Sequence, residues 1–271
     1  MSAPNDRPSP SAFRRRLLAR EPLLGTFIKT PTGHAMEIFG DVGFDFAVID
    51  AEHAPFDRTA IDVTLMAARA AGIAGLVRVA EPSPAQLLAA LDDGAAGVLV
   101  PHVASAEAAR AAVSACRYRG GRRGFSNSPR AGRYGGLAMW PHVEAQDAAV
   151  AVIAMIEDPE ALDVLDAILA TEGLDAVFIG RADLTVALGA ASPDAPEVRG
   201  AIDRILAAAR AAGKPVCLMV ASAEEAKPYR ALGASAFLIG SDQGLMRQAA
   251  ARHHQDFAAL KGAAWKGSEV G

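Results

Sequence analysis

Residues 150–184, VAVIAMIEDPEALDVLDAILATEGLDAVFIGRADL, contain the unit from which the architecture of this chain is inferred. They hold two apolar runs of strand length, 150–156 and 176–179, separated by a segment of helical pattern. Two such runs with a helix between them indicate a βαβ unit, whose strands are parallel. Each run delivers one carboxylate shortly after its last apolar residue, Glu157 in the first case and Asp183 in the second.

The positions of these two carboxylates suggest a ligand site. In parallel α/β architectures, ligands bind at the carboxyl ends of the strands. Neighbouring strands lie about 5 Å apart, so Glu157 and Asp183 can reach one cation, and hard divalent ions prefer oxygen ligands. The alternative is that both acids only stabilise the first turns of the following helices. These residues alone leave the two interpretations open.

The rest of the chain repeats a pattern of helix, glycine turn and buried strand. Glycines that favour a left-handed helix end precede six of the apolar runs: Gly43, Gly72, Gly94, Gly173, Gly213 and Gly233. With the runs at 24–28 and 150–156, the sequence predicts eight strands, and their nearly continuous apolar character indicates a parallel sheet covered on both faces. Eight such units in about 250 residues predict a (β/α)8 TIM barrel. An open doubly wound sheet is the alternative, but its G-x-G-x-x-G turn is missing.

We expect three regions along the chain. Residues 1–22 form an N-terminal tail with a short basic helix at 11–20, residues 23–262 form the barrel, and residues 263–271 form a frayed C-terminal tail that includes Trp265. Residues 242–260 have the pattern of a C-terminal helix.

Composition excludes several functional classes. The chain of 271 residues is 51% hydrophobic and carries a net charge of −4, which gives no electrostatic case for binding nucleic acid or an anionic membrane. No apolar run approaches the roughly 20 residues that span a bilayer, and the N-terminus does not have the pattern of a secretory signal. Cys116 and Cys217 have no partner at metal or redox spacing, so we expect buried thiols and a cytoplasmic protein.

Charged and titratable side chains gather at the expected carboxyl ends of the strands, the face where barrels carry their active sites. They are Lys29, Asp50, Glu52, His53, Arg78, His102, Glu157 and Asp183. This set fits enolate chemistry. A divalent ion on Glu157 and Asp183 would polarise a 2-oxo acid, and Arg78 would place a fixed charge beside the developing oxyanion.

Two further functions complete this hypothesis. The substrate carboxylate can rest on the backbone N–H groups of residues 181–183 if these open a helix. His53 is the candidate general base, and the carboxylate that orients it is expected among Asp50, Glu52 and Asp92. The competing mechanism is a Schiff base on Lys29, which would need neither paired carboxylates nor an arginine.

Five segments together resemble the HpcH/HpaI aldolase family, in order from about residue 24 to about residue 260: IDAEHAP at 49–55, VRV at 77–79, LDDG at 91–94, MIE at 155–157 and FIGRADL at 178–184. Each motif alone is weak, and the combination is fairly specific. Family members are class II, metal-dependent pyruvate aldolases on a (β/α)8 barrel, such as 4-hydroxy-2-oxoheptanedioate and 2-dehydro-3-deoxyglucarate aldolases.

The resemblance implies roles for individual residues. Glu157 and Asp183 would bind a divalent cation (Mg, Mn or Co), and Arg78 would contact the pyruvate carbonyl. The stretch Gly180, Arg181, Ala182 and Asp183 would hold the substrate. His53 would act on the aldol hydroxyl with Asp92 as its partner, and Asp92 can come from a neighbouring subunit. The substrates would be a small 2-oxo acid and an aldehyde, and the assembly a homohexamer, a trimer of dimers with an exchanged C-terminal helix.

Two departures from the family pattern concern the substrate. Arg181 stands where the family commonly has proline, which would favour more acidic acceptors or leave the side chain in solvent. Met155 stands where the most similar known members carry glutamine, so a polar contact at the rim of the site is lost. Both metal carboxylates are present, so the expected reaction class is unchanged.

Two rival functions belong to other classes. One is a citrate-lyase-like C–C lyase acting on acyl-CoA thioesters, whose phosphates only residues 119–123 of the Arg-rich loop at 117–128 could bind. The other is an inactive barrel that serves as a binding protein. The same long loop suits contacts with an anionic substrate, with a neighbouring subunit, or only with solvent. For His34, His102, His142, His253 and His254 we expect structural or solvated positions.

Overall fold

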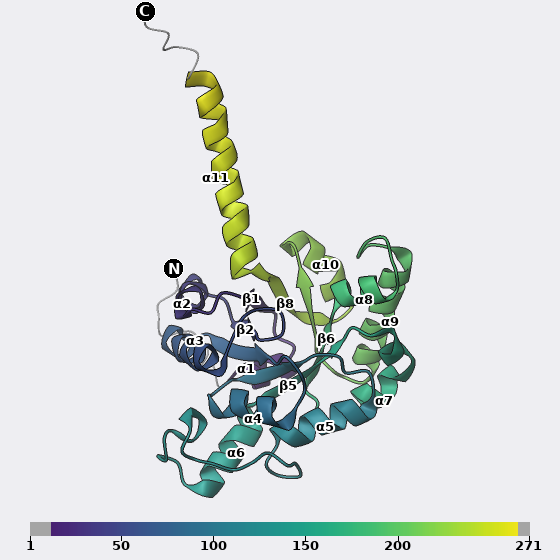
Figure 1. Cartoon of the computed structure of the whole chain (residues 1–271). Helices are drawn as coiled ribbons and strands as arrows, with labels where there is room; N and C mark the ends of the chain where they lie inside the picture. The colour runs from purple at the N-terminus through teal and green to yellow at the C-terminus, as the bar shows by residue number, and fades with distance from the viewer. Residues whose placement is uncertain (1–11, 265–271) are drawn as a thin grey trace, which may run out of the picture.

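The computed structural model describes residues 12–264, with side chains as far as residue 258, and within them eight parallel strands close into a barrel (Figure 1). Each strand pairs with its neighbours in chain order, and the first pairs with the last. This confirms the (β/α)8 barrel. The strands are β1 (Leu23–Ile28), β2 (Phe46–Asp50), β3 (Ala74–Arg78), β4 (Gly97–Val100), β5 (Ala151–Ile156), β6 (Ala176–Ile179), β7 (Val216–Val220) and β8 (Ala234–Ser241).

Helices surround this barrel and begin where the sequence provides caps. The side chains of Thr32, Asp57, Ser83, Ser105 and Ser222 each accept a hydrogen bond from a backbone N–H of the helix that follows. The helices are α1 (Phe13–Leu18), α2 (Gly33–Val42), α3 (Arg58–Ala71), α4 (Pro84–Asp92), α5 (Ala106–Cys116), α6 (Met139–Ala149), α7 (Leu165–Leu169), α8 (Arg181–Ala187), α9 (Pro196–Ala211), α10 (Ala223–Ala231) and α11 (Asp242–Ala264). Two 3-10 turns, η2 (Arg130–Gly132) and η3 (Pro159–Val164), complete them.

The six glycines predicted to end helices all lie in the left-handed region, and five of them cap a helix or directly follow its cap residue, whereas Gly173 lies in the turn between the end of α7 and β6. Their φ angles lie between 69° and 112°. Only glycine adopts such angles without a steric penalty, so these positions fix where each helix turns back into the next strand. The loops that contain them lie at the amino end of the barrel, which leaves the other end to the strand-to-helix loops.

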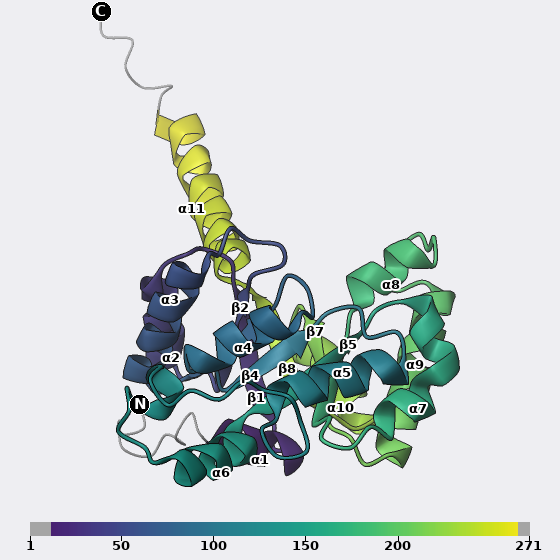
Figure 2. The same ribbon diagram turned by 60° about the horizontal axis from the view of Figure 1, so that its bottom comes forward.

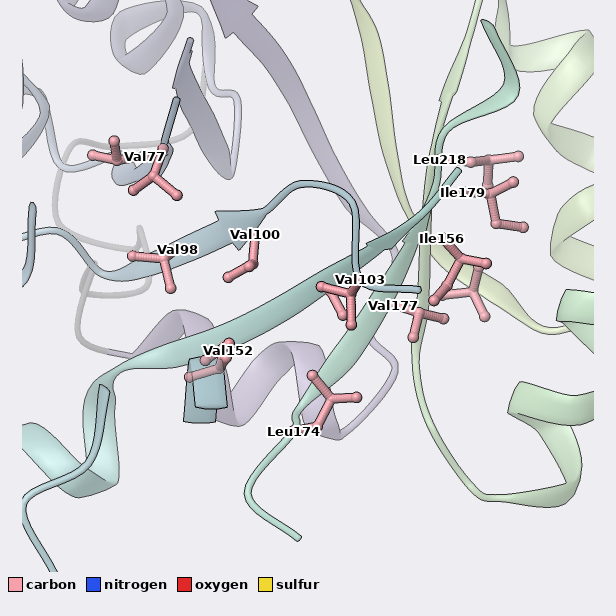
Figure 3. Packing of buried hydrophobic residues seen from close by; sticks show 14 of the residues in the cluster. Val77, Val98, Val100, Val103, Val152, Ile156, Leu174, Val177, Ile179 and Leu218 are labelled. Atoms are coloured by element: carbon pink, nitrogen blue, oxygen red, sulfur yellow. The ribbon is translucent and has the colours of Figure 1, made fainter. Parts of the chain in front are cut away.

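Two apolar layers result from the alternation of side chains along each strand. In β5, Ala151, Ile153 and Met155 point into the barrel, whereas Val152, Ala154 and Ile156 point outward to the helices. Figure 3 shows part of the outer layer, in which valine, leucine and isoleucine side chains of β3 to β7 pack together. Continuing the alternation past β5 places Glu157 on the inner face.

Helix α1 closes the amino end of the barrel, beside α6 (Figure 2). Phe13 and Leu17 are buried with the inner layer, and the ring centroids of Phe13 and Phe46 lie 5.2 Å apart. Arg14 donates to Asp175 at 2.8 Å and 2.9 Å. With this end covered, the carboxyl ends of the strands remain the open end of the barrel.

The long Arg-rich loop between α5 and α6 follows a helix and therefore lies at the closed amino end. Two of its arginines are buried in ion pairs, Arg117 with Asp175 at 2.8 Å and Arg123 with Asp92 at 3.2 Å. Arg117 also donates to the carbonyl of Val150 at 2.8 Å. These contacts hold the loop against the amino end of the barrel. Within one chain, the loop therefore lies away from the open end.

Helix α11 leaves the open end and extends away from the barrel (Figure 1). Its large apolar side chains Met246 and Phe257 are each 65% exposed. The helix continues to Ala264, whereas Trp265 and the rest of the expected C-terminal tail, like residues 1–11, lie outside the described residues.

Both cysteines are buried, as expected, and burial raises the pKa of the Cys116 and Cys217 thiols to about 12. Between residues 12 and 264, no helix has the length and apolar character needed to cross a bilayer.

Candidate active site

Asp50 is the centre of a charged network at the open end of the barrel. It is the last residue of β2 and is paired in register with Arg78, the last residue of β3. Arg78 donates to both carboxylate oxygens, from Nε to Oδ1 at 3.0 Å and from Nη2 to Oδ2 at 2.8 Å. Lys29 Nζ lies 2.9 Å from the same Oδ2, and the backbone N–H of His53 donates to Oδ1 at 3.1 Å.

These donors determine the charge of Asp50. Burial disfavours its ionised form, but Arg78, Lys29 and the His53 N–H outweigh burial and lower the pKa of Asp50 to about 2. Asp50 is therefore a carboxylate at neutral pH. The amine of Lys29 is held by this buried carboxylate, an arrangement that does not favour its use as a nucleophile.

Arg78 joins this network to Glu52. Its Nη1 lies 3.0 Å from Oε2 of Glu52, and its guanidinium stacks 5.1 Å from the ring centroid of Phe27. Glu52 Oε2 is buried and accepts no hydrogen bond in the described chain. Its ion pair with Arg78 lacks hydrogen-bond geometry, so this oxygen keeps the capacity to accept from a further polar partner, such as water or a substrate.

Glu157 is a buried carboxylate whose basic neighbour is the imidazole of His102, with Nδ1 3.6 Å from Oε1. It is 1% exposed, and its Oε1 accepts the backbone N–H of His102 at 2.8 Å. No lysine or arginine within residues 12–258 forms an ion pair with it. Burial, together with the charges of Asp183 and Glu52, raises the pKa of Glu157 to about 7 against the opposing effect of His102.

Asp183 lies in the first turn of α8, which begins at Arg181 with Gly180 as its N-terminal cap residue. The charge of Asp183 acts on Glu157, and β5 and β6 are adjacent, with Ile156 paired to Ile179. The structure therefore places the two carboxylates close enough to interact electrostatically. Residues 181–183 do open a helix, so their N–H groups lack intrahelical acceptors.

The two carboxylates fit a divalent cation. Glu157 is desolvated, its carboxylate is destabilised by the charge of Asp183, and its pKa is affected by no arginine or lysine of the described residues. A dication would remove this repulsion. A group of three protein ligands is absent from the described residues, which is compatible with an ion such as Mg²⁺ that keeps several waters and uses one or two carboxylates plus substrate oxygens.

His53 and Asp92 are not brought together within one chain. The imidazole of His53 is 55% exposed at the open end, and its nearest carboxylate is Glu52, at 3.7 Å between Nε2 and Oε2. Asp92 ends α4 at the closed end, where it pairs with Arg123. A contact between Asp92 and His53 would therefore require a second subunit.

His102 is solvated, as expected, with 58% of its side chain exposed, but it has charged partners that the sequence did not indicate. It follows β4, and its ring lies among three carboxylates: Nδ1 is 3.2 Å from Asp158 Oδ1 and 3.6 Å from Glu157 Oε1, and Nε2 is 3.6 Å from Glu52 Oε1. Burial opposes the charged ring, but these acids outweigh it and raise the pKa of His102. The sequence feature that could have identified His102 is its position directly after a predicted strand.

Other histidines behave as expected. His142 is buried at the closed end, 3.1 Å from the Tyr118 hydroxyl. His34 lies in the first turn of α2, with Nδ1 2.6 Å from the capping hydroxyl of Thr32.

The two departures from the family pattern occupy defined positions. The side chain of Arg181 is not left in solvent, since it is 18% exposed. Its Nη1 pairs with Glu225 at 2.6 Å and donates to the Tyr229 hydroxyl at 3.1 Å, both on α10. Met155 is buried inside the barrel with Phe178. The floor beneath the charged network is consequently apolar at this position.

The fold and the site define a (β/α)8 barrel with acidic and basic side chains at the carboxyl ends of its strands. The chain belongs to the HpcH/HpaI aldolase/citrate lyase family, whose model matches residues 23–249.

Individual relatives agree with this assignment. The chain is 37% identical over 243 residues to the 5-keto-4-deoxy-D-glucarate aldolase of Klebsiella pneumoniae subsp. pneumoniae, covering 89% of this chain and 94% of the relative. A crystal structure of an HpcH/HpaI family protein from Burkholderia cenocepacia J2315 has a TM-score of 0.86 at 30% identity, covering 92% and 99% of the two chains. A crystal structure described as citrate synthase SbnG has a TM-score of 0.81 at 30% identity, covering 94% and 98%.

Proposed function

We propose that the chain is a divalent-metal-dependent aldolase. It reversibly cleaves a 4-hydroxy-2-oxo acid into pyruvate, or a close 2-oxo acid, and an aldehyde. The observation that supports the proposal is the pair Glu157 and Asp183, two carboxylates close enough to interact, with no lysine or arginine of the described residues paired to Glu157. A divalent ion bound there would supply Lewis-acid polarisation of the 2-oxo group. The names of the curated relatives, aldolases of a hydroxy-oxo diacid, support the same substrate class.

The residues of the chain provide the remaining functions. Arg78 has its Nη1 on the Glu52 side of the network, where that oxygen lacks a hydrogen bond, and it would stabilise negative charge on the 2-oxo oxygen as the C3–C4 bond breaks. The N–H groups at 181–183 would hold the substrate carboxylate.

His53 would take the proton of the 4-hydroxyl group. Its ring is accessible from the open end, as a base acting on a diffusible substrate requires. Glu52 is the carboxylate nearest to it in this chain, and Asp92 remains a proposed partner from a neighbouring subunit. His53→Ala should lower kcat by about 10²-fold or more with little change in metal affinity.

We also propose a homo-oligomer in which α11 packs on another copy, in keeping with the expected hexamer of exchanged helices. The support is the extension of α11 away from its own barrel and the exposure of Met246 and Phe257. Light scattering on the full chain should give a multiple of 28.0 kDa, whereas truncation before Asp242 should give smaller species. A full-length monomer at micromolar concentration would contradict this.

The acyl-CoA alternative finds no support in the site. The Arg-rich loop that would bind CoA phosphates lies at the closed end, and Arg117 and Arg123 are committed to Asp175 and Asp92.

The test of the proposed function is pyruvate release from a panel of 4-hydroxy-2-oxo acids, assayed with Mg²⁺, Mn²⁺ or Co²⁺ and without CoA. We expect EDTA to abolish release and added metal to restore it. Absence of metal-dependent release from every acid tried would leave the family membership intact but refute the proposed activity.

A further inference from the structure

The turn that follows β4 has an unusual backbone. His102 has φ = +53°, in the left-handed region that residues other than glycine rarely adopt. The other non-glycine residues with positive φ in the described chain are Arg20, Arg133 and Tyr134. These three lie in loops outside the strand ends, whereas His102 stands at the carboxyl end of a barrel strand.

This conformation aims two successive N–H groups at β5. The N–H of Val103 donates to the carbonyl of Met155 at 3.2 Å, continuing the contact between β4 and β5. The N–H of His102 donates instead to the Glu157 side chain, at 2.8 Å from Oε1. Because His102 is left-handed, its N–H donates to the Glu157 carboxylate instead of to a backbone carbonyl of β5.

Fixing Oε1 determines where the other oxygen of Glu157 lies. Oε2 is packed against Gly180, close enough that a β-carbon there would lie 2.6 Å from it. Gly180 immediately precedes α8, whose first turn carries Asp183. Glu157 is held from one side by the His102 N–H and from the other by the Gly180 backbone, and its remaining oxygen faces the strand that leads to Asp183.

The imidazole of His102 explains how a non-glycine residue keeps this conformation. Its Nδ1 contacts Asp158 Oδ1 at 3.2 Å, and its Nε2 lies 3.6 Å from Glu52 Oε1. The ring thus connects the loops that follow β2 and β5. These contacts offset the steric cost that the left-handed backbone imposes on an L-residue.

We propose that His102 is a positioning residue for Glu157: its left-handed backbone directs an N–H to Oε1, which leaves Oε2 available to a cation shared with Asp183. This inference rests on the proposed function. Groups that orient a metal ligand through hydrogen bonds determine metal affinity without touching the metal. The role belongs to the backbone of His102, and the ring serves to hold that backbone.

Three substitutions at this position separate the backbone from the ring. His102→Gly removes the ring but adopts φ = +53° without penalty, and His102→Asn also tolerates this region. His102→Ala removes the ring and keeps the penalty. Arg20→Ala is the matched control, because Arg20 has φ = +56° in the turn between α1 and β1, at the closed end.

The measurement is Mn²⁺ binding to the full chain by calorimetry, with thermal melting to verify folding. We expect Ala to weaken Mn²⁺ binding about tenfold, and Gly and Asn to bind within about threefold of the unsubstituted chain because they retain the left-handed turn. Arg20→Ala should leave Mn²⁺ affinity unchanged.

Other outcomes would overturn the inference. Equal weakening by Ala, Gly and Asn would assign the role to the ring, and no weakening by any of them would remove His102 from metal binding. An equal effect of Arg20→Ala would show a general loss of stability. If the unsubstituted chain bound no Mn²⁺, the proposed function itself would fail, and this inference with it.

Discussion

Gly180 and Glu157 are in direct contact across β5 and β6. A β-carbon built on Gly180 would lie 2.5 Å from Cβ and 2.6 Å from Oε2 of Glu157. Real side chains do not approach so closely, so the backbone at position 180 serves as the wall against which the carboxylate rests. The same glycine caps the helix that carries Asp183, and it therefore fixes the spacing of the two acids.

Gly180→Ala should displace the Glu157 carboxylate and weaken Mn²⁺ binding about tenfold or more. Gly200→Ala is the matched control, because Gly200 lies within α9 and nothing lies within 4 Å of its added β-carbon. That control should raise the free energy of unfolding by about 0.5–1 kcal/mol and leave metal affinity unchanged. Equal metal affinity in both variants would show that the Gly180 contact is not needed.

The ion pairs of Asp50 predict a pH dependence of stability. Its pKa is lowered from 3.8 to about 2, so this group stabilises the fold above about pH 4 and loses that contribution as the pH falls through about 2. The difference corresponds to about 2 kcal/mol at neutral pH, and loss of the carboxylate also leaves Lys29 and Arg78 without their buried partner.

Asp50→Asn should therefore lower the free energy of unfolding by at least about 2 kcal/mol at pH 7. The difference in free energy of unfolding between the variant and the unsubstituted chain should become progressively smaller as the pH falls below 4. Urea denaturation across this range provides the measurement. A gap that stays constant down to pH 2.5 would mean that Asp50 does not carry a lowered pKa in the folded state.

Much of this architecture can be predicted from sequence because it depends on local patterns. The apolar runs and six helix-ending glycines indicated the eight strands, and the glycines have the expected positive φ. The alternation along β5 also places Glu157 on the inner face, next to the strand that leads to Asp183. These features need only the periodicity of the chain and the chirality of its residues.

Contacts between distant loops could not be predicted in the same way. His102 has no charged neighbour in sequence, and its partners Glu52, Glu157 and Asp158 follow two other strands. Arg181 pairs with Glu225, which is 44 residues further along the chain. No local sequence pattern indicates that this residue of α10 faces Arg181. The Arg-rich loop is different: because it follows a helix, its location at the closed end was predictable.

Lys29 provides a test against the Schiff-base mechanism. Its amine lies 2.9 Å from Asp50 Oδ2, and an ammonium ion held by a carboxylate is not a nucleophile. Treatment with borohydride and substrate, followed by mass spectrometry of the Lys29 peptide, should give no covalent adduct. An adduct on Lys29 together with irreversible inactivation would assign the class I mechanism instead.

The proposed mechanism requires that Glu157 and Asp183 share one dication, which in turn binds the 2-oxo acid. Glu157→Gln keeps the size of the side chain and removes its charge. The most direct measurement is therefore Mn²⁺ binding and metal-dependent pyruvate release by this variant. Its melting temperature, compared with that of the unsubstituted chain, verifies folding. We predict a folded protein in which metal binding and turnover are both lost. A folded Glu157→Gln variant with unchanged metal-dependent turnover would contradict the central claim.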